Sequence, residues 1–232
     1  MPSPDPPSLD RAARQRDLVP PERLAEVHAV VIGVGAVGRQ VALQLAAMGV
    51  PKMTLYDPDT VEVENLAPQG FWETDVGDFK VHAVANVAHQ QFPQMDLTAV
   101  PDRFRRSEVR KWAGDRLLAV FACVDAIDAR RMIWEAARSR VGFFADGRVA
   151  AEVVRVLASA APHRNEYSRT LFPAGQAFAG ACTAKSTIYT ASVAAGLMLA
   201  QFARWLRGQP VTPDQVLNLL AAELTVAGPV PL

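Results

Sequence analysis

The stretch "AVVIGVGAVGRQVALQLAAMG", residues 29–49, decides the fold class of this chain. Its first residues, up to Gly33, form a short apolar run rich in β-branched side chains, which is typical of a buried strand. From residue 36 onward the apolar side chains recur at helical spacing. Between these segments lies "GVGAVG", in which Gly33, Gly35 and Gly38 match the G-x-G-x-x-G turn that joins a first strand to its helix. Such a turn lets the backbone approach phosphates, so the stretch predicts a nucleotide-binding domain.

Strand-like and helix-like segments alternate as far as about residue 145. Further strands are expected at residues 52–57, 97–100, 117–124 and 142–145, and helices at residues 80–91, 107–112 and 127–140. This alternation predicts an α/β, Rossmann-like fold with a mostly parallel sheet and helices on both faces. The pattern then changes to a strand within residues 149–161, a long connection at 162–181, a helix at 186–207 and strand material at 216–227. We expect these C-terminal strands to be antiparallel.

The chain of 232 residues is long enough for one large domain with a sizeable core. Four prolines lie within residues 1–10, and a short polar stretch follows. We therefore expect residues 1–20 to form a disordered or extended lead-in, and residues 21–232 to form a single domain. The first residues lack the basic and apolar regions of a signal peptide, which makes the cytoplasm the expected compartment.

Composition argues against several other classes of protein. Lys and Arg together number 24, as do Asp and Glu, so no overall charge favours nucleic acid or an anionic membrane. Residues 186–203 carry no charge and approach the length of a membrane span, but their Ala, Ser and Thr content favours a buried helix. Cys123 and Cys182 are too few for a disulfide framework or a four-cysteine zinc site. Cys123 lies in an apolar strand, where we expect it to be a core residue.

Polar residues follow the second expected strand at an unusual density. Asp57 ends that strand, where a carboxylate can accept hydrogen bonds from ribose hydroxyls; with the glycine turn it indicates an adenine nucleotide, either NAD or ATP. The next residues, "DPDTVEVENLAPQ", add the carboxylate of Asp59 and the amides of Asn65 and Gln69. A dinucleotide reductase has no use for these groups at this point. A site that presents the α-phosphate of a triphosphate needs them to hold ribose, phosphates and magnesium.

Six spaced motifs occur in an order that gives the chain a resemblance to a known family. They are "RAARQ", "GVGAVG", "DPDTVEVENLAPQ", "DVGDFKVHAV", "CVDAIDAR" and "CTAKSTIYTASVAAG". With them the chain resembles the ThiF/MoeB/HesA family, bacterial relatives of the ubiquitin-activating enzymes, from about Arg11 to the end of the long helix. The resemblance implies a ThiF-type adenylation domain that uses ATP and Mg²⁺ to adenylate the C-terminal glycine of a small ubiquitin-like protein. It also implies a homodimer.

The resemblance further implies roles for individual residues, matched by their position in the motifs. Asp57 would hold the ribose, and Asp125 would bind or position magnesium. The positions implied to contact the phosphates or to match the nucleotide-site pattern are Arg14, Asn65, Lys80 and Arg130. These cations and the metal would neutralise the charge that builds on the α-phosphate as the glycine carboxylate attacks.

Cys182 precedes the long helix, where the helix dipole and Lys185 would stabilise a thiolate. In relatives, a cysteine at this place can accept the activated protein as a thioester or take part in sulfur-carrier loading. The alternative is a small apolar residue packed behind a loop. Cys182 is therefore a candidate catalytic residue, together with Arg14, Lys80 and Asp125.

The chain departs from the family pattern at three places. Pro68 stands where the motif "NLxRQ" has an arginine that reaches the triphosphate of the neighbouring subunit; Arg148 or Lys185 are possible substitutes. Ala126 replaces the asparagine of "DN". The paired cysteines that bind structural zinc in many relatives are absent, which is typical of a zinc-free subset.

Three functions from different classes remain open. The first is an activating enzyme, either for a bacterial ubiquitin-like conjugation system that passes a thioester to a conjugating protein, or for a sulfur carrier in thiamine or molybdenum cofactor synthesis. The second is an NAD(P)-dependent oxidoreductase, which leaves Asp59, Asn65 and Lys80 without a role. The third is a non-catalytic binding subunit, which the proline at position 68 favours.

Overall fold

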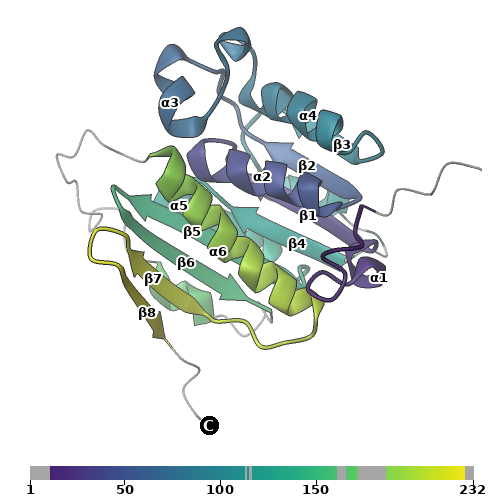
Figure 1. The fold of residues 1–232 in the computed structure, drawn as a ribbon, viewed down its shortest axis with the longest axis vertical. Coiled ribbons are helices and arrows are strands. Elements are labelled where there is room, and N and C mark those ends of the chain that lie inside the picture. The colour runs from purple at the N-terminus through teal and green to yellow at the C-terminus, as the bar shows by residue number, and fades with distance from the viewer. Residues whose placement is uncertain (1–10, 113, 115–116, 161–165, 172–186, 228–232) are drawn as a thin grey trace, which may run out of the picture.

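One eight-stranded sheet organises the chain, in the strand order β3-β2-β1-β4-β5-β6-β7-β8 (Figure 1). The computed structural model describes residues 11–112, 114, 117–160, 166–171 and 187–227. The parallel strands are β1 (Val27–Ile32), β2 (Lys52–Tyr56), β3 (Asp96–Val100), β4 (Leu117–Ala122) and β5 (Phe143–Ala150). The antiparallel strands are β6 (Val153–Ser159), β7 (Asp214–Asn218) and β8 (Glu223–Ala227). The predicted Rossmann-like, mostly parallel sheet with antiparallel C-terminal strands is confirmed.

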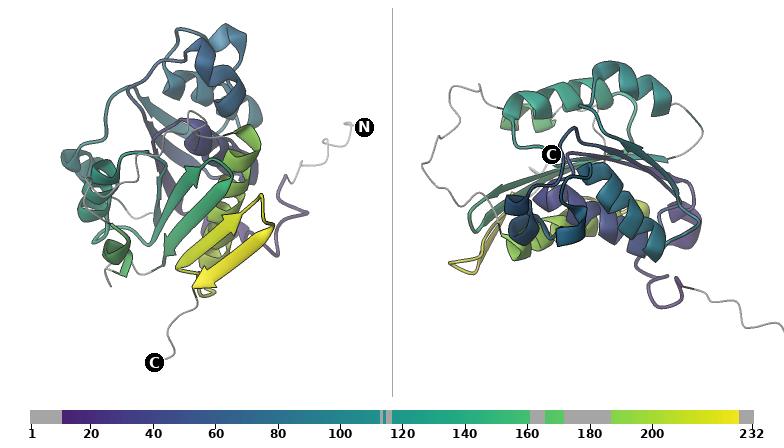
Figure 2. Two further views of the ribbon diagram at one scale, coloured as in Figure 1. Left: turned by 90° about the vertical axis from the view of Figure 1, so that its left-hand side faces the viewer. Right: turned by 90° about the horizontal axis from the view of Figure 1, so that it is seen from above.

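Helices cover both faces of the sheet (Figure 2). One face carries α2 (Ala36–Met48), α4 (Lys80–Gln91) and α6 (Ile188–Leu206), and the opposite face carries α5 (Ile127–Ala137). The short helices are α1 (Pro21–Leu24) and α3 (Leu66–Gln69). In β1, Ala29 and Val31 belong to the first apolar layer, whereas Val30 and Ile32 belong to the second. Because β1 is buried on both sides, its sequence is apolar at nearly every position.

The strand order reverses beside β1, which lies between β2 and β4. The chain runs outward from β1 through β2 to β3, and then returns to the other side of β1 as β4. All these strands are parallel, so their carboxyl ends share one edge of the sheet. In open α/β sheets, the crevice at such a reversal is the usual ligand site.

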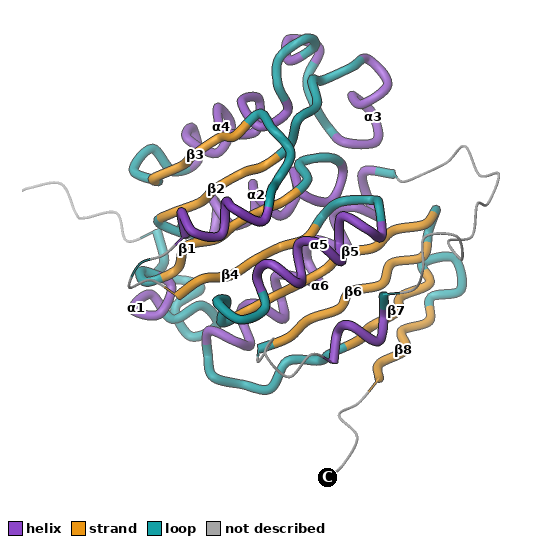
Figure 3. The backbone as a smooth tube through the Cα atoms, turned by 180° about the vertical axis from the view of Figure 1, so that it is seen from behind, coloured by secondary structure: helices purple, strands orange, loops and turns teal. Residues whose placement is uncertain are grey.

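The C-terminal half of the sheet continues as antiparallel strands, in which β5–β6 and β7–β8 are hairpins and α6 lies between β6 and β7 in the chain (Figure 3). β5 extends to Ala150, and Ala151 then turns the chain into β6 with a φ of 51°. The expectation of a strand that ends at residue 145 was wrong. Polar residues at 146–148 interrupt the apolar run, but their backbone still pairs with β6. The helix expected at residues 107–112 is a 3₁₀ helix, Arg106–Trp112.

Helix α6 packs on the sheet through a stripe of buried small and apolar side chains that includes Ala191, Ala194 and Met198. Thr187 caps its first turn by accepting a hydrogen bond from the amide of Thr190. Across the portion of the chain that is described, no helix combines the length and apolarity that a membrane span requires. The expectation of a buried helix therefore agrees with the packing of α6.

Residues 11–19, within the predicted lead-in, form turns beside the C-terminal end of α2. Gln15 donates to the carbonyl of Met48 at 2.8 Å, and Arg11 donates to the carbonyls of Ala46 and Ala47. These contacts add hydrogen-bond donors to carbonyl groups in the last turn of the helix, where acceptors outnumber intrahelical donors. Val19 is buried in the core behind them.

Candidate functional site

The glycine turn after β1 is packed too tightly for any side chain at two of its positions. Gly33 has a φ of +86°, and a Cβ there would lie 2.7 Å from the carbonyl oxygen of Cys123. A Cβ on Gly38 would lie 1.8 Å from the carbonyl oxygen of Gly33. The turn therefore brings the first residues of α2 against β1 and the end of β4. The N-cap of α2 is Gly35, which has no side chain to bond the first amides of the helix. Those amides can therefore bind an anion.

Asp57 joins the glycine turn to the end of β2. Its buried carboxylate accepts hydrogen bonds from the amide of Val34 at 2.6 Å and from the amide of Asp59 at 2.9 Å. Burial raises the pKa of Asp57, while the two amides and the charge of Lys80 act in the opposite direction. Each carboxylate oxygen has a second acceptor site, so the side chain is held in one orientation and can still accept hydrogen bonds from a ligand.

Asp59 and Lys80 extend this polar group across the loop. The Nζ of Lys80 lies 3.1 Å from Oδ2 of Asp59, and the amide of Lys80 donates to the carbonyl of Asp59 at 3.0 Å. Lys80 is buried at the start of α4, and its charge opposes the rise in the pKa of Asp57 that burial causes. The structure thus brings together Asp57, Asp59 and Lys80 as the sequence predicted.

The two predicted amides, Asn65 and Gln69, lie in the loop after β2 that approaches the glycine turn. Asn65 is buried, and its Oδ1 accepts a hydrogen bond from the amide of Glu62 at 3.0 Å, which caps the 3₁₀ turn Val63–Asn65 before α3. Gln69 ends α3 with its Oε1 about 3.7 Å from the position that a Cβ on Gly35 would take. That buried oxygen has no hydrogen-bond partner among the described residues. An unpaired buried acceptor is costly, so a ligand donor at this point would stabilise the site.

Asp125 follows β4 on the opposite side of β1 and is exposed. It lies two residues after Cys123, whose carbonyl contacts the glycine turn, and two residues before α5. In the described residues, no group of three or more His, Cys, Asp or Glu side chains could hold a metal ion. Magnesium keeps several water and phosphate ligands and needs only one or two carboxylates. The single carboxylate of Asp125 therefore fits a magnesium ion that arrives with a nucleotide, and does not fit a protein-only metal site.

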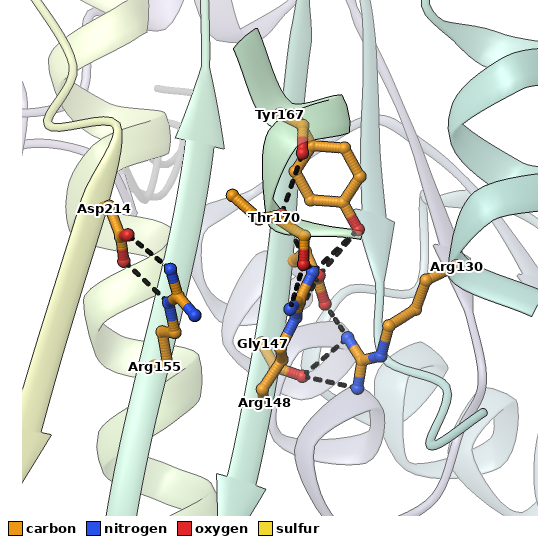
Figure 4. A network of polar contacts seen from close by, with 8 residues as sticks. Arg130, Gly147, Arg148, Arg155, Tyr167, Thr170 and Asp214 are labelled. Carbon is orange, nitrogen blue, oxygen red and sulfur yellow. Dashed lines mark hydrogen bonds and ion pairs between the residues drawn. The ribbon is translucent and has the colours of Figure 1, made fainter. Parts of the chain in front are cut away.

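Arg130 was predicted to belong to the nucleotide site, but its guanidinium is occupied inside the protein (Figure 4). It forms an ion pair with Asp146, and Nη1 and Nη2 each lie 3.3 Å from the carbonyl oxygen of Gly147. Burial and the neighbouring charge of Arg148 lower the pKa of Arg130 to about 10. Arg130 therefore links α5 to β5 through Asp146 and Gly147.

Arg148, one expected substitute for the arginine missing at position 68, is also engaged. Its Nε donates to Asp146 at 2.8 Å and its Nη1 donates to the carbonyl of Thr170 at 3.1 Å. The hydroxyl of Tyr167 donates to the same Asp146 oxygen at 2.7 Å. Sequence reasoning missed the central carboxylate, Asp146. The available signal was a single acidic residue inside the apolar strand "FFADG".

The remaining predicted residues lie away from the glycine turn or outside the described residues. Arg14 is exposed within residues 11–19, beside the far end of α2, so a single chain does not bring it to the site. Helix α2 has 13 residues and is therefore about 20 Å long. Cys182 and Lys185 lie outside the described residues, as does most of the expected connection at 162–181.

A comparison with protein families gives one match that spans the fold. The family model described as "ThiF family" matches residues 12–226. The chain belongs to the ThiF family. The match includes the glycine turn, the loop after β2 and the antiparallel strands, and it confirms the resemblance found in the six sequence motifs.

Curated relatives are similar to this chain over about half of its length. Mouse adenylyltransferase and sulfurtransferase MOCS3 is 32% identical over 152 residues, which cover 57% of this chain and 32% of the mouse protein. Ubiquitin-like modifier-activating enzyme 5 of Drosophila ananassae is 32% identical over 130 residues, covering 51% and 33%. The ThiS adenylyltransferase of Escherichia coli K12 is 32% identical over 113 residues, covering 48% and 45%. The match thus spans less than half of each relative.

Solved structures share the fold of this ThiF-family chain at low sequence identity. E. coli MccB with AMPCPP and MccA has a TM-score of 0.73 at 14% identity, over 96% of this chain and 72% of that chain. PaaA has a TM-score of 0.70 at 19% identity, over 89% and 74%. These similarities bear on the fold alone.

The thiol of Cys123 is expected to react slowly because of its surroundings. Burial raises the pKa of its thiol to about 12. Because the thiolate is the reactive form, we expect iodoacetamide at pH 8 to modify Cys123 in the folded protein on the order of a thousandfold more slowly than an ordinary cysteine. Peptide mass spectrometry after timed alkylation, with a guanidinium-unfolded control, measures this rate. Equal alkylation rates in the folded and unfolded protein would contradict the prediction.

Proposed function

We propose that this chain is an ATP-dependent adenylyltransferase that activates the C-terminal carboxylate of a small ubiquitin-like or sulfur-carrier protein. The observation that carries the proposal is the continuous set of polar contacts from the amide of Val34 through Asp57 and Asp59 to Lys80. This set combines a candidate ribose acceptor with a buried cation, and it is joined to the glycine turn through Val34. An oxidoreductase that binds NAD needs the first of these groups and has no need of the second.

Each group has a physical role in the proposed reaction. Asp57 accepts hydrogen bonds from the ribose hydroxyls, and the amides of α2 with Lys80 bind the phosphates. The partner's carboxylate oxygen attacks the α-phosphorus and forms an O–P bond, and the bond to the bridging oxygen breaks, so pyrophosphate leaves with the electron pair. Asp125 would help to hold a magnesium ion, which would supply charge neutralisation on the phosphates. The protein contributes mainly charge and position, since attacker and target are both anionic.

The finer parts of the proposal concern the partner and the assembly. We expect a partner that ends in glycine, because a residue without a side chain can enter a narrow site in an extended conformation. The names of three relatives refer to a ubiquitin-like modifier, to ThiS and to a sulfurtransferase, which supports either a conjugation system or sulfur-carrier loading. A thioester on Cys182 belongs to the first of these branches. A homodimer would bring a second copy of the exposed Arg14 to each site.

The test is ATP–pyrophosphate exchange with purified chain, Mg-ATP and glycine-ending ubiquitin-like proteins from the same genome. We expect exchange that depends on the partner and is lost when its terminal glycine is removed. We also expect Lys80→Met to reduce the exchange rate by about a hundredfold, because it removes a buried cation beside the phosphates. Intact mass spectrometry then separates a released adenylate from a dithiothreitol-sensitive adduct. Thermal stabilisation by NAD but not by Mg-ATP would refute the proposal in favour of an oxidoreductase.

A further inference from the structure

Arg39 is a buried cation that the sequence analysis did not assign to any role. It follows Gly38 directly, in the first turns of α2, and only 7% of its surface is exposed. Its guanidinium carbon lies 5.2 Å from the centre of the Phe71 ring. Its Nη1 lies 3.1 Å from the position that a Cβ on Gly70 would take. Arg39 therefore fills the space between α2 and the loop that follows α3.

The guanidinium of Arg39 makes no hydrogen bond or ion pair within the described part of the chain. Burial lowers its pKa, and the charge of Asp75 acts in the other direction. One carboxylate oxygen of Asp75 accepts a hydrogen bond from the amide of Trp72 at 2.9 Å. A guanidinium carries five N–H donors, and no Arg39 nitrogen is among the fully buried unpaired atoms of the described residues. These donors therefore suit an anionic ligand that reaches them from outside the described chain.

The neighbours of Arg39 indicate which class of anion it could bind. Arg39 lies in the first turns of α2, and its guanidinium lies against Phe71 and Gly70 in the loop that follows α3. Gln69 has an unpaired buried oxygen close to Gly35. The next residue, Gly70, lies beside the Arg39 guanidinium. The first amides of α2, Gln69 and Arg39 therefore gather at one end of the helix. A polyphosphate is the ligand whose charge suits this group of donors.

We propose that Arg39 binds the triphosphate of the nucleotide held by its own chain and supplies the positive charge that Pro68 does not. This inference rests on the proposed function. Pro68 lies in α3 close to this place, and Arg148 is occupied by Asp146 and Thr170. The cation thus comes from α2 of the same chain and not from a neighbouring subunit.

The test compares the affinities of Mg-ATP and adenosine for Arg39→Met by titration calorimetry. The methionine keeps an apolar side chain against Phe71 but removes the charge. We expect Kd for Mg-ATP to rise by about 10- to 100-fold, since hydrogen bonds to charged groups are lost. Kd for adenosine should stay within about twofold, and Arg39→Lys should recover part of the loss. Arg23→Met is the matched control, because Arg23 is exposed on α1, before β1, at the opposite end of the strands.

Several outcomes would overturn the inference. An unchanged Kd of Arg39→Met for Mg-ATP would show that Arg39 does not contact the phosphates. Equal losses for Mg-ATP and adenosine, or a change in oligomeric state without a change in Kd, would make Arg39 a packing or interface residue. Wild-type protein that binds neither ligand would overturn the proposed function as well. Wild-type binding with partner-dependent exchange, and an unaffected Arg39→Met, would overturn this inference alone.

Discussion

Asp57→Asn is expected to weaken the binding of Mg-ATP and of adenosine together, each by at least about a hundredfold. The carboxylate accepts hydrogen bonds from the amides of Val34 and Asp59, and its remaining acceptor sites face the proposed ribose. An asparagine has one acceptor oxygen, and its amide group would oppose one of these backbone donors. Because hydrogen bonds to charged acceptors each contribute about 1.5–3 kcal/mol, the loss of two exceeds a hundredfold in Kd. Titration calorimetry with both ligands measures the effect.

Asp96→Asn is the matched control for this prediction. Asp96 begins β3, at the opposite end of the parallel strands from Asp57, and 67% of its side chain is exposed. Only its ion pair with Lys52, at 3.5 Å, is weakened, and an ion pair of that exposure contributes little. We expect less than about a twofold change in Kd for Mg-ATP. If Asp57→Asn binds adenosine as the wild type does, Asp57 is a structural bridge of the glycine turn and not a ribose ligand.

The parts of the site that the sequence predicted are those determined by local chain geometry. The glycine turn requires its residues because a Cβ on Gly38 would clash with the carbonyl of Gly33. Asp57 follows β2 directly, so its place at the carboxyl edge results from the strand alone. Lys80 begins α4 and is joined to Asp59 through the backbone. In these cases the sequence neighbours of a residue largely determine its surroundings, so a motif predicts them.

The parts that the sequence could not predict depend on contacts between distant elements. Arg130 matched a nucleotide-site motif, but its partner is Asp146, which α5 and the connection to β5 bring beside it. No spacing rule distinguishes an arginine that binds a phosphate from one that binds a buried carboxylate. No role was assigned to Arg39 from the sequence, because a charged residue in an amphipathic helix is usually exposed. Only the packing of the loop at Gly70 and Phe71 shows that it is buried.

Asp146→Ala is expected to lower the free energy of unfolding by about 3–5 kcal/mol. Asp146 is completely buried, and it pairs with Arg130 and Arg148, of which 7% and 15% of the side chains are exposed. Alanine leaves two buried guanidinium groups without their counter-charge, which is the condition under which breaking a buried pair is most costly. It also removes the acceptor of the Tyr167 hydroxyl. Urea unfolding, followed by tryptophan fluorescence, measures the change.

Asp214→Ala is the matched control, since Asp214 pairs with Arg155 at 2.6 and 2.9 Å between two strands of the same sheet. The Arg155 side chain is 38% exposed and can be hydrated after the substitution, so we expect a loss of about 0–1 kcal/mol. Similar losses for the two variants would mean that Arg130 and Arg148 find other acceptors. A large loss of stability for Asp146→Ala with an unchanged Kd for Mg-ATP would mean that Asp146 and its two arginines stabilise the fold without affecting nucleotide binding. A loss in both would mean that the cluster also positions the loop of Asp125, which lies two residues before α5, the helix that carries Arg130.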